Sequence, residues 1–179
     1  MKHTFSTATV VAALALTFGS AAHAADGTIT FTGSISAQTC TINGNGSGGT
    51  DFTVTLPTVA ASALPSDGAT SGRTPFSIAV SGCSTKSGTV STWFEPGSNV
   101  DATSGLLKNT AAGGAANVQV GLLQNDGTTA VRPGITSQVA NIDGTTGDAK
   151  LDYFAQYVAT GGAAGSGAVS TSVTYSMVY

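Results

Sequence analysis

The strongest constraint on the fold is the alternation of residue types at the two ends of the chain. From Val169 to the last residue, Tyr179, the odd positions are mostly apolar, and a similar two-residue period runs through residues 28–35. This is the period of a β-strand with one buried face. The chain stops within the pattern that begins at Val169, so we expect a strand edge whose backbone donors and acceptors are unpaired. An added extended segment could complete such a sheet.

Between these ends the sequence indicates short strands and no long helix. After the first 24 residues, no window keeps a 3.6-residue apolar period over helical length, whereas short runs rich in Val, Ile, Thr and aromatic residues alternate with clusters of Gly, Asn, Asp and Ser. Seven short strands predict an all-β sandwich. The predicted strands cover residues 28–35, 51–56, 75–81, 88–94, 117–123, 151–159 and 169–179.

Turn residues separate these strands. Residues 125–127 and 143–144 carry hairpin or loop signals. Flexible loops are predicted at residues 44–49 and 161–167, and residues 60–64 are predicted to hold one helical turn. No repeat or linker divides the chain, so we expect one sandwich domain over residues 36–179, preceded by a short N-terminal arm over residues 25–35.

The first 24 residues have the features of a secretory signal. Lys2 precedes an apolar run over residues 10–16, and the small-x-small sequence Ala22-His23-Ala24 follows. The run is about half of the ~20 apolar residues that span a bilayer, and no later run is long and uninterrupted enough. We therefore expect removal of residues 1–24 and export without direct membrane insertion. Cleavage after Ala22 also fits the small-residue rule.

Both cysteines, Cys40 and Cys83, lie in the predicted mature chain. Exported proteins fold under oxidising conditions, so we expect one disulfide between them. In the chain-entropy model this bond removes on the order of 4 kcal/mol of unfolded-state freedom. Free thiols or a metal pair are the alternatives, but neither cysteine has a nearby histidine or second cysteine.

Charged residues are scarce. Asp, Glu, Lys and Arg make up 8% of the chain, against about 25% in ordinary soluble domains. The formal net charge is −3, and without a basic patch we expect no nucleic acid partner. Low charge weakens repulsion between copies, which suits a protein that stacks on itself. An ordinary secreted surface explains the composition equally well.

Residues for catalysis are also scarce. Both histidines lie within the first 24 residues, so the predicted mature chain has no imidazole to act as a general base or metal ligand. We expect no enzymatic activity, no metal and no cofactor. A hydrolase with catalytic carboxylates is the alternative function, because Asp143, Asp148 and Asp152 are close in sequence and Glu95 follows two aromatic residues.

The two neighbouring aromatic residues, Trp93 and Phe94, raise a second alternative. Either ring could stack on a sugar, as in a self-complete, secreted carbohydrate-binding β-sandwich. Adjacent residues on a strand point to opposite faces, so we expect one ring in the core and the other as a lone exposed aromatic at most.

Five short blocks, in this order, resemble the type 1 fimbrial subunits of chaperone-usher pili. They are residues 27–33 with Cys40 beyond them, residues 75–78 leading to Gly82 and Cys83, residues 117–123 with Gly127 beyond them, the alternating Tyr153, Ala155 and Tyr157, and finally Tyr175 with the terminal Tyr179. The resemblance covers nearly all of the predicted mature chain.

The resemblance implies an incomplete immunoglobulin-like β-sandwich that lacks its last strand and is completed by donor-strand addition from a neighbouring subunit. A groove should run beside the C-terminal strand and receive that neighbour's N-terminal arm. The implied donor-strand residues are Gly27, Ile29 and Phe31, with Ile35 near the point where the arm joins the domain. The implied acceptor-groove or chaperone-contact residues are Val173, Tyr175, Met177 and Tyr179.

The implied function is that of a structural subunit, which polymerises with other pilin subunits into a surface fimbria used in adhesion. A periplasmic chaperone and an outer-membrane usher are the other implied partners, and export runs through the periplasm to the cell surface. The usable arm favours a shaft subunit, and a minor adaptor pilin is the alternative within the family.

Overall fold

The computed structural model describes residues 28–35 and 37–179. The chain divides into two units, Met1–Ile35 and Ser36–Tyr179. The predicted signal over residues 1–24 and the predicted donor residue Gly27 lie outside the described residues.

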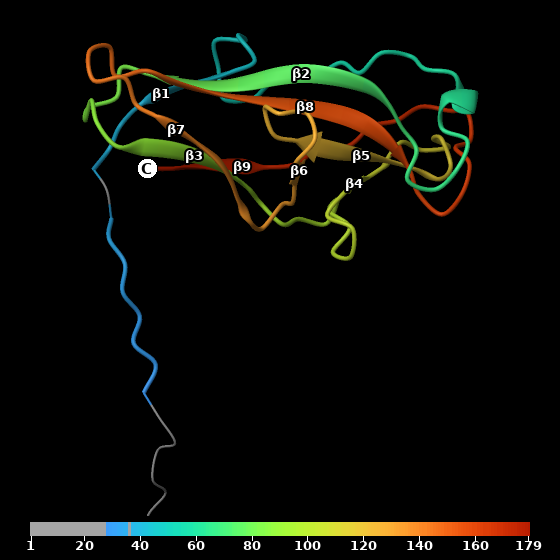
Figure 1. Ribbon diagram of the computed structural model, residues 1–179, viewed down its shortest axis with the longest axis horizontal. Coiled ribbons are helices and arrows are strands. Elements are labelled where there is room, and N and C mark those ends of the chain that lie inside the picture. The colour runs from blue at the N-terminus through green and yellow to red at the C-terminus, as the bar shows by residue number, and fades with distance from the viewer. Residues whose placement is uncertain (1–27, 36) are drawn as a thin grey trace, which may run out of the picture. The chain divides into compact units, whose positions relative to one another are not determined.

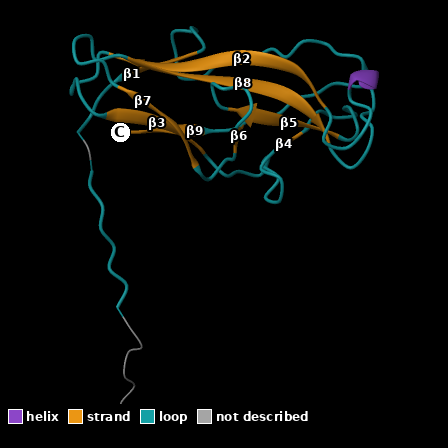
Figure 2. Ribbon diagram, in the orientation of Figure 1, coloured by secondary structure: helices purple, strands orange, loops and turns teal. Residues whose placement is uncertain are grey.

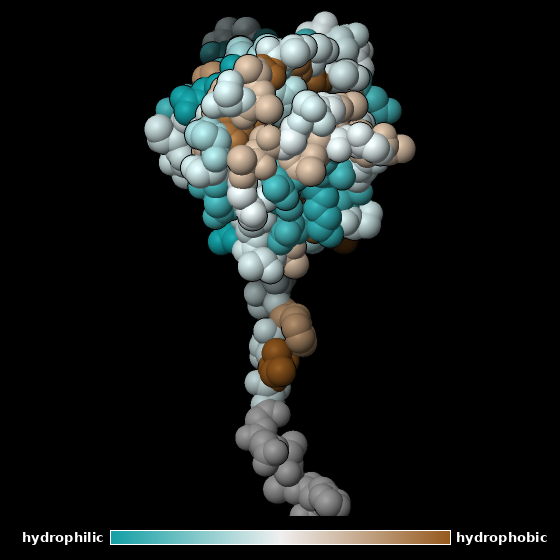
Figure 3. Space-filling view, turned by 90° about the vertical axis from the view of Figure 1, so that its right-hand side faces the viewer, coloured by the Kyte–Doolittle hydropathy of each residue, from teal (hydrophilic) through white to brown (hydrophobic). Residues whose placement is uncertain are grey.

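The described part of the first unit contains neither a helix nor a strand. The side chains of Ile29, Phe31 and Ile35 are 79%, 89% and 101% exposed, and apolar surface on this segment stands out in brown in Figure 3. The prediction of a strand over residues 28–35 is therefore wrong for the chain by itself. A strand requires a second strand to pair with its backbone groups, and none among the described residues pairs with this segment.

The second unit is a sandwich of antiparallel strands in two sheets, which Figures 1 and 2 show as two layers. Its elements are β1 (Thr41–Gly44), the 3₁₀ helix η1 (Ala61–Ala63), β2 (Thr70–Ser81), β3 (Thr89–Phe94), β4 (Leu107–Lys108), β5 (Val118–Leu123), β6 (Ala130–Val131), β7 (Thr136–Asn141), β8 (Ala149–Ala159) and β9 (Tyr175–Val178). The all-β prediction is confirmed.

The larger sheet has the order β1-β2-β8-β5-β4, with β6 also paired to β5. Its centre is the long β2–β8 pair, in which Phe76 is opposite Tyr153 and Ile78 is opposite Leu151. The smaller sheet has the order β7-β3-β9. In this sheet β9 pairs with β3 on one side only, so it is an edge strand.

The core lies between the two sheets and contains a cluster of aromatic rings. The Phe76 and Tyr153 rings stack at 5.4 Å, and Phe94 meets Tyr153 edge-on at 5.2 Å. Tyr153 is fully buried, so its hydroxyl needs a partner. It lies 2.7 Å from the Ser137 hydroxyl, which donates to the Thr92 carbonyl at 2.7 Å. Burial raises the pKa of Tyr153 above its ordinary value.

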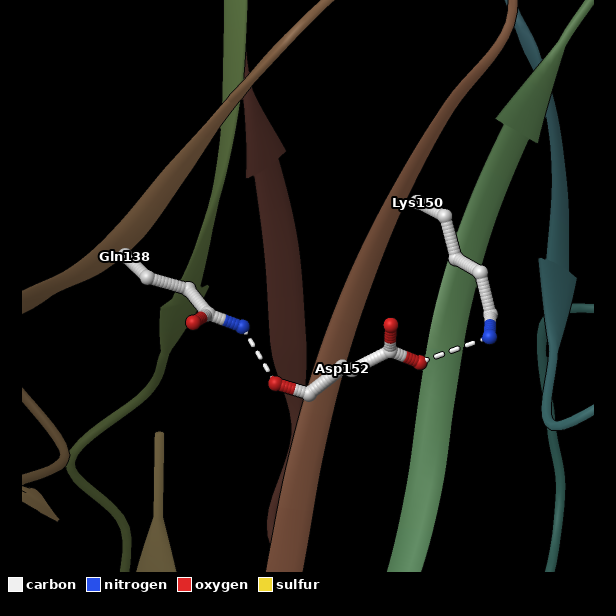
Figure 4. A network of polar contacts seen from close by, with 3 residues as sticks. All are labelled: Gln138, Lys150 and Asp152. Carbon is white, nitrogen blue, oxygen red and sulfur yellow. Dashed lines mark hydrogen bonds and ion pairs between the residues drawn. The ribbon is translucent and has the colours of Figure 1, made fainter. Parts of the chain in front are cut away.

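A second polar contact between the sheets runs through Gln138 on β7 (Figure 4). Its amide donates to the Asp152 carbonyl on β8, and its own carbonyl accepts the Asn125 backbone N–H at 3.2 Å. The Asp152 carboxylate pairs with Lys150 at 2.7 Å, but both side chains are exposed, so that ion pair contributes little to stability.

The structure confirms four predicted strands, which correspond to β2, β3, β5 and β8. The predicted strand over residues 169–179 is confirmed only as Tyr175–Val178, and residues 51–56 are not a strand. β1, β4, β6 and β7 were not predicted. The helical turn at residues 60–64 is confirmed as η1, and residues 124–129 form the hairpin loop between β5 and β6.

The predicted disulfide between Cys40 and Cys83 is present. It joins the residue before β1 to the chain just after β2. Beside it the Gln38 side chain donates to the Thr85 carbonyl at 3.1 Å and accepts the Thr85 N–H at 3.1 Å. The start of the domain is therefore fixed covalently and by hydrogen bonds.

Candidate functional site: an open apolar groove

A groove of about 870 Å³ opens along one flank of the sandwich. Two chain segments that are distant in sequence form its walls. The first wall comprises residues 50–56, before η1, and the second wall comprises residues 169–177, which end in β9. The floor consists of core side chains from both sheets, namely Phe76, Phe94, Leu107, Val120, Leu122 and Ala155.

The first wall alternates like a strand without being one. Phe52, Val54 and Leu56 are half-buried and pack against the core, whereas the residues between them are exposed. Phe52 lies over Gly44, where any added Cβ would come within 2.0 Å of the ring. Within the described chain, residues 51–56 take part in no backbone–backbone hydrogen bond. Side-chain contacts, and not backbone pairing, therefore hold this wall in place.

The second wall has the same alternation. Val169, Thr171, Val173, Tyr175 and Met177 are half-buried, and the residues between them are exposed. Its backbone bonds run away from the groove. Among the described residues they join β9 to β3, the Thr174 carbonyl to the Glu95 N–H and the Ser170 carbonyl to the Thr110 N–H.

No backbone hydrogen bond joins the two walls anywhere in the described chain. Both walls therefore present unpaired backbone groups above an apolar floor, which is the surface that an added strand satisfies.

One polar contact does cross the groove. The Tyr175 hydroxyl donates to the Thr50 carbonyl at 2.7 Å, and its ring meets Phe52 edge-on at 6.1 Å. Burial, followed by the nearby Asp51 carboxylate, raises the pKa of Tyr175 above its ordinary value. The phenol therefore stays neutral and keeps its donor proton under ordinary conditions.

One buried polar atom in the groove lacks a partner. The Thr171 hydroxyl is shielded from solvent and makes no hydrogen bond to any residue that the structure describes. It lies between Val169 and Val173 in the otherwise apolar row of the second wall. Such a group costs about 1–3 kcal/mol when it stays unpaired.

Of the residues expected at an acceptor groove, Val173, Tyr175 and Met177 line this groove, whereas Tyr179 is not among its lining residues and is 40% exposed. Ile29 and Phe31 belong to the other unit, and Gly27 lies outside the described residues. Sequence reasoning missed the first wall. Its signal was present in the alternation of Phe52, Val54 and Leu56, which we interpreted as an ordinary strand.

The aspartates that the sequence offered as catalytic groups of a hydrolase have structural roles. Asp143 accepts the Thr145 and Thr146 N–H groups at 2.8 Å, and Asp148 accepts the Gly82 N–H at 3.2 Å. Asp152 pairs with Lys150, as described above. None of these aspartates is among the residues that line the groove.

Glu95 also has a structural role, because its carboxylate accepts hydrogen bonds from the hydroxyls of Ser176 at 2.6 Å and Thr174 at 3.1 Å. These two bonds, that from Ser176 first, lower the pKa of Glu95. The contact fastens β9 to the end of β3, on the outer side of the smaller sheet.

The two adjacent aromatic residues divide as expected. Phe94 is 2% exposed in the core, and Trp93, on the opposite face of β3, is half-buried. In the part of the chain that the structure covers, no three His, Cys, Asp or Glu side chains are grouped closely enough to hold a metal ion. Within the same residues, no helix has the length and apolar character needed to cross a membrane.

Comparison with known proteins gives consistent matches over most of the chain. Residues 56–179 match the family described as FimA: Type-1 fimbrial protein, A. The chain is 47% identical to the major fimbrial subunit SMF-1 of Stenotrophomonas maltophilia, over 89% of this chain and 95% of that protein. It is 40% identical to the F17 fimbrial protein of Escherichia coli, over 95% and 96% of the two chains.

Solved structures show the same fold. The type I fimbria protein BPSL1626 of Burkholderia pseudomallei aligns with a TM-score of 0.56 at 25% identity, covering 79% of this chain and 95% of that one. The P pilus rod subunit PapA aligns with a TM-score of 0.56 at 21% identity, covering 85% and 99%. This family is a structural one and not an enzyme class. The chain belongs to the type 1 fimbrial protein family, whose members are structural subunits of fimbriae displayed on the cell surface.

Proposed function

We propose that this subunit polymerises by donor-strand complementation, in which the arm over residues 25–35 of one copy fills the groove of the next copy. The observation that carries the proposal is the groove itself, with an apolar floor and two walls whose facing backbones are unpaired. The same chain contains an exposed segment with the complementary two-residue alternation.

The chemistry of the arm fits this site. Ile29 and Phe31 lie two residues apart, so in an extended arm both side chains point into the groove while Thr28 and Thr30 point outward. Each apolar side chain that moves from water into the groove contributes about 1.5–3 kcal/mol. Backbone bonds to the two walls would add to this.

The proposal includes two partners besides other subunits. A subunit with an empty groove is prone to aggregate, so a periplasmic chaperone fills the groove first and holds the Tyr179 carboxylate through basic residues. An outer-membrane usher is the place where the arm of the next subunit replaces the chaperone. The signal over residues 1–24 directs the chain into this route.

Within the filament we assign the chain to the shaft. Identity to a major fimbrial subunit over nearly its whole length supports this role. The alternating arm supports it as well, since a shaft subunit must both donate and accept a strand.

The test is deletion of residues 25–32 from the mature chain. The shortened chain should still accept an arm but should no longer donate one, so alone it forms no filaments, as judged by electron microscopy. The matched pair Ile29→Asp and Thr30→Asp separates the two faces of the arm, because only the first places a charge in the groove. Normal filaments from the deletion, or equal loss from both substitutions, would contradict the proposal.

A further inference from the structure

The exposed apolar residues of the sandwich unit lie together on the smaller sheet. Outside the arm, the described residues with exposed large apolar side chains are Ile135, Val139, Val178 and Tyr179. Val139 is in β7 and Val178 is in β9, whereas Ile135 directly precedes β7 and Tyr179 directly follows β9. Single exposed apolar residues scattered over a surface need no explanation, but a group on one sheet indicates a contact surface.

The strand register places the two valines in one row. Ser91 on β3 pairs with Val139 on β7 and with Val178 on β9. The residues beside Ser91 on its own strand, Val90 and Thr92, are buried in the core, so Ser91 and its two partners point to the outer face. The row therefore crosses the whole smaller sheet on its outer side, where polar side chains are usual.

The smaller sheet also contains no charged residue. None of the residues in β3, β7 and β9 is Asp, Glu, Lys or Arg, whereas β2, β4 and β8 of the larger sheet all contain charged side chains. The half-buried Trp93 lies two residues from Ser91 on the same outer face. The centre of a protein–protein interface has few charged residues and many aromatic ones. We call the surface formed by Ser91, Trp93, Val139 and Val178 the outer apolar face.

The size of the outer apolar face limits the kind of partner that it can hold. A stable interface between free proteins buries about 800 Å² on each partner, and two valines with one half-buried tryptophan expose much less than this. Such a contact forms only with a partner that is already tethered nearby, because tethering raises the effective concentration. Subunits of a fimbria are tethered to copies of themselves. The low charge of the chain also weakens repulsion between those copies.

We propose that the outer apolar face packs laterally against another copy of the chain in the same filament. This contact is separate from the groove, because neither valine nor Trp93 is among the residues that line it. A second connection between copies makes the filament more compact and stiffer than one joined end to end only. The inference rests on membership of a fimbrial family and not on the way in which the arm joins successive subunits.

Photo-crosslinking of assembled filaments of the mature chain tests the contact directly. Replacing Val139 with the photoreactive amino acid benzoylphenylalanine should give links to another copy, which mass spectrometry of the joined peptides identifies. The matched control carries the same amino acid in place of Thr70, which is exposed on the larger sheet and does not line the groove. Equal yields from the two positions would overturn the inference, as would no link from position 139 or a link only to a different protein.

Substitutions at Val139 measure what the contact does. Val139→Asp places a charge in the contact and should weaken each lateral contact about tenfold or more. Val139→Thr keeps the branched shape that strands favour, so it retains the fold and should have a smaller effect in the same direction. Filaments of both variants should form at the wild-type rate but be more flexible in electron micrographs, whereas Thr70→Asp should change neither property.

Wild-type stiffness in filaments of a folded Val139→Asp variant would contradict the inference, and near-ultraviolet circular dichroism confirms the fold of each variant. Failure of the proposed strand exchange gives a different result, because the chain without residues 25–32 would then still form filaments. Crosslinking from position 139 in those filaments would still decide whether the outer apolar face contacts another copy.

Discussion

At the residue scale, the contact that most directly joins the two sheets is the buried pair of hydroxyls on Tyr153 and Ser137. Replacing Tyr153 with Phe removes a bond at 2.7 Å and leaves Ser137 bonded to the Thr92 carbonyl. We expect Tyr153→Phe to lower the free energy of unfolding by about 1 kcal/mol. Urea unfolding measures this, with Tyr157→Phe as the control, because the Tyr157 hydroxyl makes no hydrogen bond within the described part of the chain. Equal stabilities of the two variants would contradict the assigned role.

Single carboxylates also determine how the stability of the folded chain changes at low pH. The Asp126 carboxylate accepts the Thr129 hydroxyl and the N–H groups of Thr128 and Thr129, and these bonds lower its pKa from 3.8 to about 2. A depressed pKa means that the folded state binds the proton less readily than the unfolded state. The stabilisation is thus complete above about pH 4 and is lost as the pH falls toward 2.

We therefore expect the melting temperature to fall between pH 4 and pH 2, and Asp126→Asn to reduce the steepness of that fall. Calorimetry at a series of pH values gives both slopes. Asp101 and Asp143 cap their loops in the same way and also have lowered pKa values, so part of the slope should remain in the variant. An unchanged slope in Asp126→Asn would contradict the assignment.

At the scale of elements, the strands that sequence reasoning found share a buried apolar face, as in β2, where Phe76, Ile78 and Val80 point into the core. The missed strand β7 reverses this pattern. Its inward residue Ser137 is buried because it bonds Tyr153, whereas Val139 is 60% exposed. Hydrophobic periodicity cannot identify a strand whose core position is polar. β4 and β6 have only two residues each, too few for any period.

The element that depends most on covalent support is β1, an edge strand of four residues paired only with β2. The Cys40–Cys83 disulfide lies directly before it. In the chain-entropy model, the Cys40→Ser and Cys83→Ser double variant loses about 4 kcal/mol of stability. Denaturant unfolding of the variant, compared with the oxidised wild type, tests this. A loss below about 1 kcal/mol would show that the hydrogen bonds near Gln38 suffice.

At the scale of the whole molecule, the sequence predicted a sandwich with an open flank but not the shape of that flank. The second wall was predicted because residues 169–177 alternate up to the end of the chain. The first wall was interpreted as a paired strand, since alternation reports a buried face and says nothing about backbone pairing. Whether residues 51–56 have a partner depends on where distant segments lie, and that information comes only with the three-dimensional structure.

The account rests on one claim, that an extended segment with the sequence of the arm binds in the groove. The most direct measurement is the melting temperature of the chain without residues 25–32, titrated with a peptide of residues 25–35. A ligand that binds only the folded state raises this temperature progressively with its concentration. We predict such a rise, and none with a peptide carrying Ile29→Asp and Phe31→Asp. A melting temperature that does not change with the native peptide, or that rises equally with the native and the substituted peptide, would contradict the claim.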